Sequence, residues 1–165
     1  MINLQNTGQA TAEGLSRAIK LLVYGASGVG KTSMIPTMPK PIILSAEAGL
    51  LSIAGADLPF LTIKSMDDLR EAYIWLTTSD DAEGFGSIAL DSISEIAEVC
   101  LDAEKKSAKD PRQAYGEMAT TMAQVIRMFR DIPDRHVLFT AKLDKSQDET
   151  GRMLYAPSMP GNKTG

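Results

Sequence analysis

The sequence is poor in cysteine, histidine, tryptophan and long apolar runs. Its 165 residues include one cysteine, one histidine and one tryptophan, and aromatic residues make up only 5%. A single cysteine, Cys100, excludes an intramolecular disulfide and a cysteine-rich zinc site. No apolar stretch approaches the roughly 18 residues that a membrane-spanning helix needs, and residues 1–11 lack the basic and apolar regions of a signal peptide. These absences predict a cytoplasmic protein without a membrane partner.

Positive charge is also scarce. The 17 Lys and Arg residues are outnumbered by 21 Asp and Glu residues, which gives a net charge of -4. A protein that coats nucleic acid is usually basic over its whole domain, so this balance argues against that class but leaves room for a local basic patch. With 44% hydrophobic and 23% charged residues, the composition is typical of a globular protein with one core.

Short apolar runs alternate with amphipathic segments along the chain. Five runs are typical of buried strands: 19–24, 42–45, 60–63, 87–90 and 137–141. Three segments place apolar residues at helical spacing: 66–76, 93–100 and 115–129. This alternation predicts an α/β fold, with a mostly parallel twisted sheet flanked by helices. We expect residues 1–18 to be an N-terminal arm, serving oligomerisation or flexible, and residues 19–165 to be the core.

The strongest local pattern is the segment 25–32, Gly-Ala-Ser-Gly-Val-Gly-Lys-Thr. It matches G-x-x-x-x-G-K-[ST] in full, after an expected strand and before an expected short helix. Its glycines let backbone N–H groups form an anion-binding nest around phosphate. A chance glycine-rich turn is the alternative, and the full match in this setting argues against it. We expect ATP to be bound by Gly25, Ala26, Ser27, Gly28, Val29, Gly30, Lys31, Thr32 and Ser33.

Two carboxylates are expected near that segment. The strand 87–90 ends at Asp91, which would reach the carboxyl edge of the sheet and hold Mg²⁺ together with the Thr32 hydroxyl; a helix N-cap is the alternative role. Glu47 follows the run 42–45 and would reach the same edge, where it could activate the water that attacks the γ-phosphate. A surface acid is the alternative for Glu47, and spacing alone does not decide. Lys31 would contact the β- and γ-phosphates.

Several further segments carry a resemblance to a known family. They are Ser-Ala-Glu-Ala-Gly-Leu at 45–50, Leu-Asp-Ser-Ile at 90–93, Tyr-Gly-Glu-Met at 115–118, Phe-Thr-Ala-Lys at 139–142 and Met-Pro-Gly-Asn at 159–162. Their order over about 19–161 is similar to that of the RecA-like nucleotide-binding proteins of bacteriophages. Some of those proteins act as ATP-dependent single-strand annealing or recombination proteins.

The resemblance implies a RecA-like P-loop NTPase core and a slow, DNA-stimulated ATPase in the bacterial host cytoplasm. It gives Glu47 the role of general base, and it places Lys142 at the γ-phosphate sensor position, where RecA has a glutamine. It implies single-stranded DNA, further copies of the chain and a single-strand-binding protein as partners. Relatives continue beyond the Pro-Gly segment, so the resemblance indicates a short or truncated chain.

RecA-like proteins contact single-stranded DNA through two loops, which correspond here to residues 103–112 and 143–155. In 105–112, the four bases Lys105, Lys106, Lys109 and Arg112 oppose one acid, a net charge of +3 (four minus one). Such charge would attract phosphate, although a solvated basic surface is the alternative. Residues 142–152 balance three bases with three acids, so charge gives the second loop no support.

Two other functions are open from the sequence. A small-molecule kinase shares the P-loop but needs arginine-rich lid segments, and the arginines here are few and scattered. A non-catalytic, nucleotide-gated interaction protein would bind ATP without turning it over.

Overall fold

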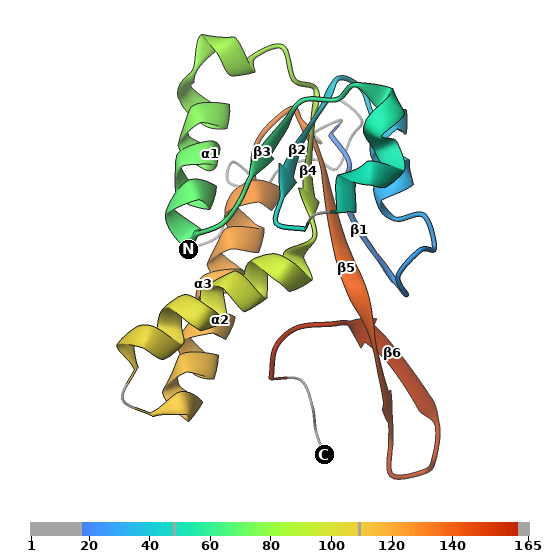
Figure 1. The fold of residues 1–165 in the computed structure, drawn as a ribbon, viewed down its shortest axis with the longest axis vertical. Coiled ribbons are helices and arrows are strands. Elements are labelled where there is room, and N and C mark those ends of the chain that lie inside the picture. The colour runs from blue at the N-terminus through green and yellow to red at the C-terminus, as the bar shows by residue number, and fades with distance from the viewer. Residues whose placement is uncertain (1–17, 48, 109, 162–165) are drawn as a thin grey trace, which may run out of the picture.

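The apolar runs form a single parallel sheet (Figure 1). The computed structural model describes residues 18–47, 49–108 and 110–161. Parallel strands lie side by side in the order β1, β5, β4, β2, β3. They are β1 (Lys20–Gly25), β2 (Pro41–Ser45), β3 (Phe60–Thr62), β4 (Ser87–Asp91) and β5 (His136–Gln147). Each begins within one residue of its predicted start, and the predicted α/β class is confirmed. The predicted N-terminal arm lies outside the described residues except for Ala18.

Both faces of the sheet are covered (Figure 1). Three α-helices lie on one face: α1 (Met66–Thr78), α2 (Ile93–Ser107) and α3 (Pro111–Arg130). The 3₁₀ segments η2 (Thr32–Thr37) and η3 (Gly49–Ala56) lie on the other, and a third, η4 (Asp80–Ala82), follows α1. Because successive strand residues point to opposite faces, Ile88 and Leu90 enter the helix-side core while Ala89 packs against the 3₁₀ side. Burial on both faces explains why the three central residues of β4, 88–90, are all apolar.

Side-chain caps set where the helices begin. At α1 the Ser65 hydroxyl accepts from the Asp68 N–H at 3.1 Å, and the Asp68 carboxylate accepts from the Ser65 N–H at 2.9 Å, a reciprocal capping box. Ser92 caps α2, and its oxygen accepts from the Glu95 N–H. Asp91 therefore does not cap that helix, although the sequence left this role open.

The connection expected at 103–112 is mostly helical. Helix α2 continues to Ser107, and α3 begins at Pro111 with Asp110 as its N-cap. Pro111 is compatible with this start, because a proline at the first helical position forfeits no intrahelical hydrogen bond. Lys105 and Lys106 thus lie in the last turn of α2, and Arg112 in the first turn of α3.

The stretch expected as a second loop is a β-hairpin. Strand β5 runs beyond the sheet to Gln147 and pairs antiparallel with β6 (Met153–Pro157). The Asp148 carboxylate accepts from the N–H groups of Thr150 and Arg152, which closes the turn. The hairpin projects from the body of the molecule (Figure 1). In the part of the chain that the structure describes, no helix is long and apolar enough to cross a membrane.

Candidate functional site

The glycine-rich segment 25–32 joins the end of β1 to η2 and forms one wall of a cavity of about 240 Å³. Its turn depends on two glycines with positive φ, Gly28 at 79° and Gly30 at 94°, which other residues adopt only with strain. The cavity is lined by Ser27, Gly28, Gly30, Lys31, Thr32, Ser33, Glu47 and Ser52. Glu47 comes from beyond β2, so two separate strands bring their carboxyl ends to one cavity.

The Lys31 side chain folds across the loop. Its ammonium donates to the carbonyl oxygens of Gly25 at 3.0 Å and Ala26 at 2.9 Å. These bonds keep a positive charge beside a turn whose glycine conformations allow close approach of the backbone to a ligand. The arrangement suits an anion such as a phosphate group.

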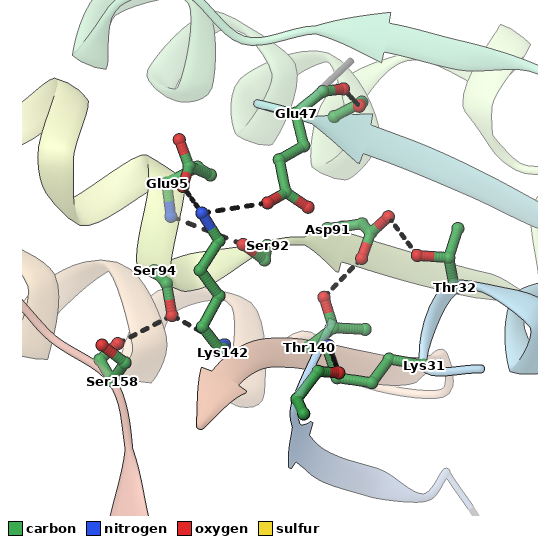
Figure 2. Close-up of polar contacts among 12 residues, drawn as sticks. Lys31, Thr32, Glu47, Asp91, Ser92, Ser94, Glu95, Thr140, Lys142 and Ser158 are labelled. Carbon is green, nitrogen blue, oxygen red and sulfur yellow. Dashed lines mark hydrogen bonds and ion pairs between the residues drawn. The ribbon is translucent and has the colours of Figure 1, made fainter. Parts of the chain in front are cut away.

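Asp91 lies at the end of β4 with an exposed fraction of only 1%. Its Oδ2 accepts a hydrogen bond of 3.0 Å from the Thr32 hydroxyl, and its Oδ1 accepts one from the Thr140 hydroxyl (Figure 2). A buried carboxylate needs such partners because desolvation of an unpaired charge is costly. The structure thus brings together the two residues predicted to hold Mg²⁺.

The donors present fit Mg²⁺. The ion prefers hard oxygen ligands, keeps several waters, and is usually held by one or two carboxylates together with substrate phosphates. The Thr32 hydroxyl and the Asp91 carboxylate supply such oxygens at the wall of the phosphate-sized cavity. Among the described residues, no group of three or more His, Cys, Asp or Glu side chains could hold a metal by itself. A shared site, completed by phosphate and water, is what these side chains could form.

The Glu47 carboxylate faces a cation. Its Oε1 lies 3.2 Å from the Lys142 ammonium, which also pairs with Glu95 Oε1 (Figure 2). The hydrogen bond to Glu95 raises the pKa of Lys142 above its usual value, and the hydrogen bond to Glu47 adds a smaller effect in the same direction. The exposed fractions of the side chains are 50% for Lys142, 33% for Glu47 and 29% for Glu95. The cluster is therefore open to solvent and to a ligand.

Two members of the site were missed by the sequence reasoning. Thr140, two residues before Lys142, contacts Asp91 because its side chain points from β5 toward the end of β4. The alternation of β5 was the signal that could have found it. Glu95 occupies the first turn of α2 in the pattern Ser-x-x-Glu, which marks a helix start but gives no hint of its partner in space.

The residues predicted to contact DNA lie apart from the cavity. Lys105 and Lys106 end α2 and Arg112 begins α3, whereas Lys109 lies outside the described residues. The α2–α3 connection and the tip of the β5–β6 hairpin extend toward the same end of the molecule (Figure 1). On the hairpin, the Lys145 ammonium lies 5.9 Å from the centroid of the Tyr155 ring.

Comparison with known proteins places this chain in a family. A family model described as an AAA domain matches residues 17–163. The SPbeta prophage-derived uncharacterized protein YorG of Bacillus subtilis (strain 168) is 30% identical over 112 residues, which cover 64% of this chain and 34% of the relative. The chain therefore spans about a third of the length of that relative.

Solved structures resemble the fold. A type III secretion system ATPase of pathogenic bacteria gives a TM-score of 0.54 at 16% identity, over 81% of this chain and 48% of that one. A KaiC-like protein of Pyrococcus horikoshii OT3 gives a TM-score of 0.47 at 15% identity, over 90% of this chain and 83% of that one. The likeness to the secretion ATPase concerns the fold alone. With the strand order, it confirms the predicted α/β fold, a mostly parallel sheet flanked by helices.

Proposed function

This chain belongs to the AAA domain family, and we propose that it binds ATP with Mg²⁺ and hydrolyses the terminal phosphate. One observation carries the proposal: Glu47 lines the same cavity as Lys31 and Thr32. A phosphate-binding turn and a carboxylate able to accept a proton thus share one space. The 3.0 Å hydrogen bond from Thr32 to Asp91 supports the metal part of the proposal.

Each residue then has a stated role. The backbone of 25–32 and the Lys31 ammonium hold the phosphates and stabilise charge on the transferring group. Thr32 and Asp91 would hold Mg²⁺, which would neutralise phosphate charge. Glu47 orients the attacking water and takes its proton, while the water oxygen bonds to the γ-phosphorus and the bond to the β–γ bridging oxygen breaks. ADP and inorganic phosphate are the products.

Lys142 places a cation next to the proposed general base. Its ammonium is 3.2 Å from Glu47 Oε1, so the general base has a fixed neighbour. A lysine acts on phosphate as a compact point charge, unlike the glutamine of RecA. We propose that Lys142 senses the γ-phosphate from this position.

The experiment that tests the proposal compares ATP turnover and ATP binding in Glu47→Gln and Lys31→Ala. Loss of turnover with retained binding in Glu47→Gln supports the base. Turnover of Glu47→Gln at the parent rate contradicts it. Transfer of phosphate to a nucleoside acceptor in place of water would favour a kinase, and binding without turnover in the parent would favour a nucleotide-gated interaction protein.

We also propose that the chain acts on single-stranded DNA in phage recombination or strand annealing, as a homo-oligomer and beside a single-strand-binding protein. The prophage origin of the relative supports this. So do the basic ends of α2 and α3 and the Lys145–Tyr155 pair, because cations attract phosphate and exposed aromatic rings stack with bases. Both features extend toward one end of the molecule (Figure 1).

A further inference from the structure

One ammonium is shared by two carboxylates from different elements. Lys142 on β5 pairs with Glu47, which follows β2, and with Glu95 in the first turn of α2 (Figure 2). Only Glu47 lines the P-loop cavity, whereas Glu95 and Lys142 line a neighbouring cavity of about 590 Å³. Lys142 therefore lies on the boundary between the two cavities.

The main chain of Lys142 is fixed on both sides. Its N–H donates to the Ser94 hydroxyl oxygen at 2.9 Å, and its carbonyl accepts from the Ser158 N–H at 2.7 Å. The Ser94 hydroxyl in turn donates to the Ser158 carbonyl at 2.7 Å. With the backbone held in this way and the side chain half exposed, the position of the ammonium depends on the carboxylates that it contacts.

We propose that Glu95 is a positioning residue for the hydrolysis: it holds the Lys142 ammonium and so leaves the Glu47 carboxylate free to take a proton from water. This inference rests on the proposed function. An ammonium has three donors, and when all of them turn to one carboxylate they occupy the lone pairs that a base needs. Glu95 competes for those donors from the side remote from the phosphate-binding turn.

The surrounding charges favour an ammonium that is shared between the Glu47 and Glu95 carboxylates. Glu47, Glu95 and Lys142 sum to a net charge of -1 (one minus two). Glu98, Asp144 and Lys105 also line the larger cavity, and Lys31 lies with Glu47 on the smaller one. Of the two contacts, the hydrogen bond to Glu95 has the larger effect on the pKa of Lys142. Removal of Glu95 would therefore lower that pKa and leave the ammonium with Glu47 as its carboxylate partner.

The contact can be measured without any turnover. The full chain is labelled with a trace of acetic anhydride at neutral pH, and acetylation of Lys142 is compared by mass spectrometry with that of exposed Lys64. Only the neutral amine reacts, so a lower pKa of Lys142 raises its labelling, here by about threefold to tenfold. We expect this rise in Glu95→Gln. Glu98→Gln is the matched control, one turn further along α2 on the same cavity, and should leave labelling unchanged.

The positioning role is measured by steady-state kinetics. In Glu95→Gln we expect kcat to fall about tenfold with KM for ATP unchanged, and Glu95→Asp should recover part of the loss because it restores the charge. In a Lys142→Met background, Glu95→Gln should have little further effect. If Glu95→Gln lowers kcat equally in the parent and in the Lys142→Met background, the positioning role is overturned. The same holds if Glu95→Gln leaves kcat unchanged in a parent that turns over ATP. Neither result affects the proposed function. A parent without turnover overturns the proposed function and the positioning role together, and the labelling then still reports whether Glu95 holds Lys142.

Discussion

The Thr32 hydroxyl donates a hydrogen bond of 3.0 Å to Asp91 Oδ2, although the two residues are 59 positions apart in the chain. The contact crosses a strand, because β5 lies between β1 and β4 in the sheet. Thr140 of β5 completes it by donating to the other carboxylate oxygen. Hydroxyls from η2 and β5 therefore converge on the carboxylate that ends β4, an arrangement that suits a magnesium–phosphate site.

The first prediction concerns metal dependence. Asp91→Asn replaces an acceptor-only carboxylate by an amide and weakens Mg²⁺ binding, because the ion prefers charged oxygen ligands. We expect the Mg²⁺ concentration for half-maximal turnover to rise at least about tenfold. Asp102→Asn, on the exposed side of α2, is the matched control. An unchanged Mg²⁺ titration in Asp91→Asn would rule out the metal role.

The second prediction concerns stability. Ser65→Ala removes the hydroxyl that accepts from the Asp68 N–H at 3.1 Å, and N-cap losses of this kind cost about 1 kcal/mol. Urea denaturation followed by circular dichroism should show that decrease in the free energy of unfolding. Thr77→Ala near the other end of α1, where the hydroxyl bonds only within its own helix, should change it less. Equal losses would argue against the capping box.

The third prediction concerns alkaline pH. The hydrogen bonds to Glu95 and Glu47 raise the pKa of Lys142, so the ion pairs stabilise the fold fully below the lysine's unfolded pKa of about 10.4 and lose that effect as pH rises through the higher folded value. The difference in unfolding free energy between parent and Lys142→Met should stay constant at neutral pH and shrink above about pH 10.4. A difference that grows there would contradict the assignment.

The fourth prediction concerns nucleic acid. Tyr155→Ala removes an exposed ring from the hairpin, and the loss of base stacking should weaken single-stranded DNA binding by about 1–3 kcal/mol. Fluorescence anisotropy at two salt concentrations would measure this. Binding of the parent should weaken as salt rises, because phosphate contacts release counterions. Met153→Ala, on the same strand, is the control for general disturbance of the hairpin. DNA binding that Tyr155→Ala leaves intact would exclude the hairpin as the contact.

Much of the fold could be predicted because its signals are local. Short apolar runs indicate buried strands, and the P-loop is a contiguous motif. Helix α2 was expected to end early because its last turn, around Lys105 and Lys106, is exposed and polar and so gives no apolar period. The part of the hairpin before β6, residues 142–152, was read as a loop for a similar reason. Both of its faces are largely exposed, so β5 beyond Lys142 lacks the alternation that reveals a half-buried strand.

The site was predicted less completely than the fold. Residues that follow strands, such as Glu47 and Asp91, could be assigned to the carboxyl edge from topology alone. Thr140 and Glu95 act through contacts with residues 49 and 47 positions away in the chain, and spacing in the sequence carries no information on such pairs. The resemblance placed Lys142 and Glu47 near the same γ-phosphate, but it did not predict the ion pair between them.

In the proposed mechanism, Glu47 takes a proton from water at a nucleotide held by Lys31 and its loop. The most direct measurement is single-turnover hydrolysis of radiolabelled ATP by the Glu47→Gln chain, with ATP binding measured on the same samples. We expect ATP binding within about threefold of the parent and hydrolysis slower by about 10²-fold or more. Hydrolysis at the parent rate in a chain that still binds ATP would contradict it.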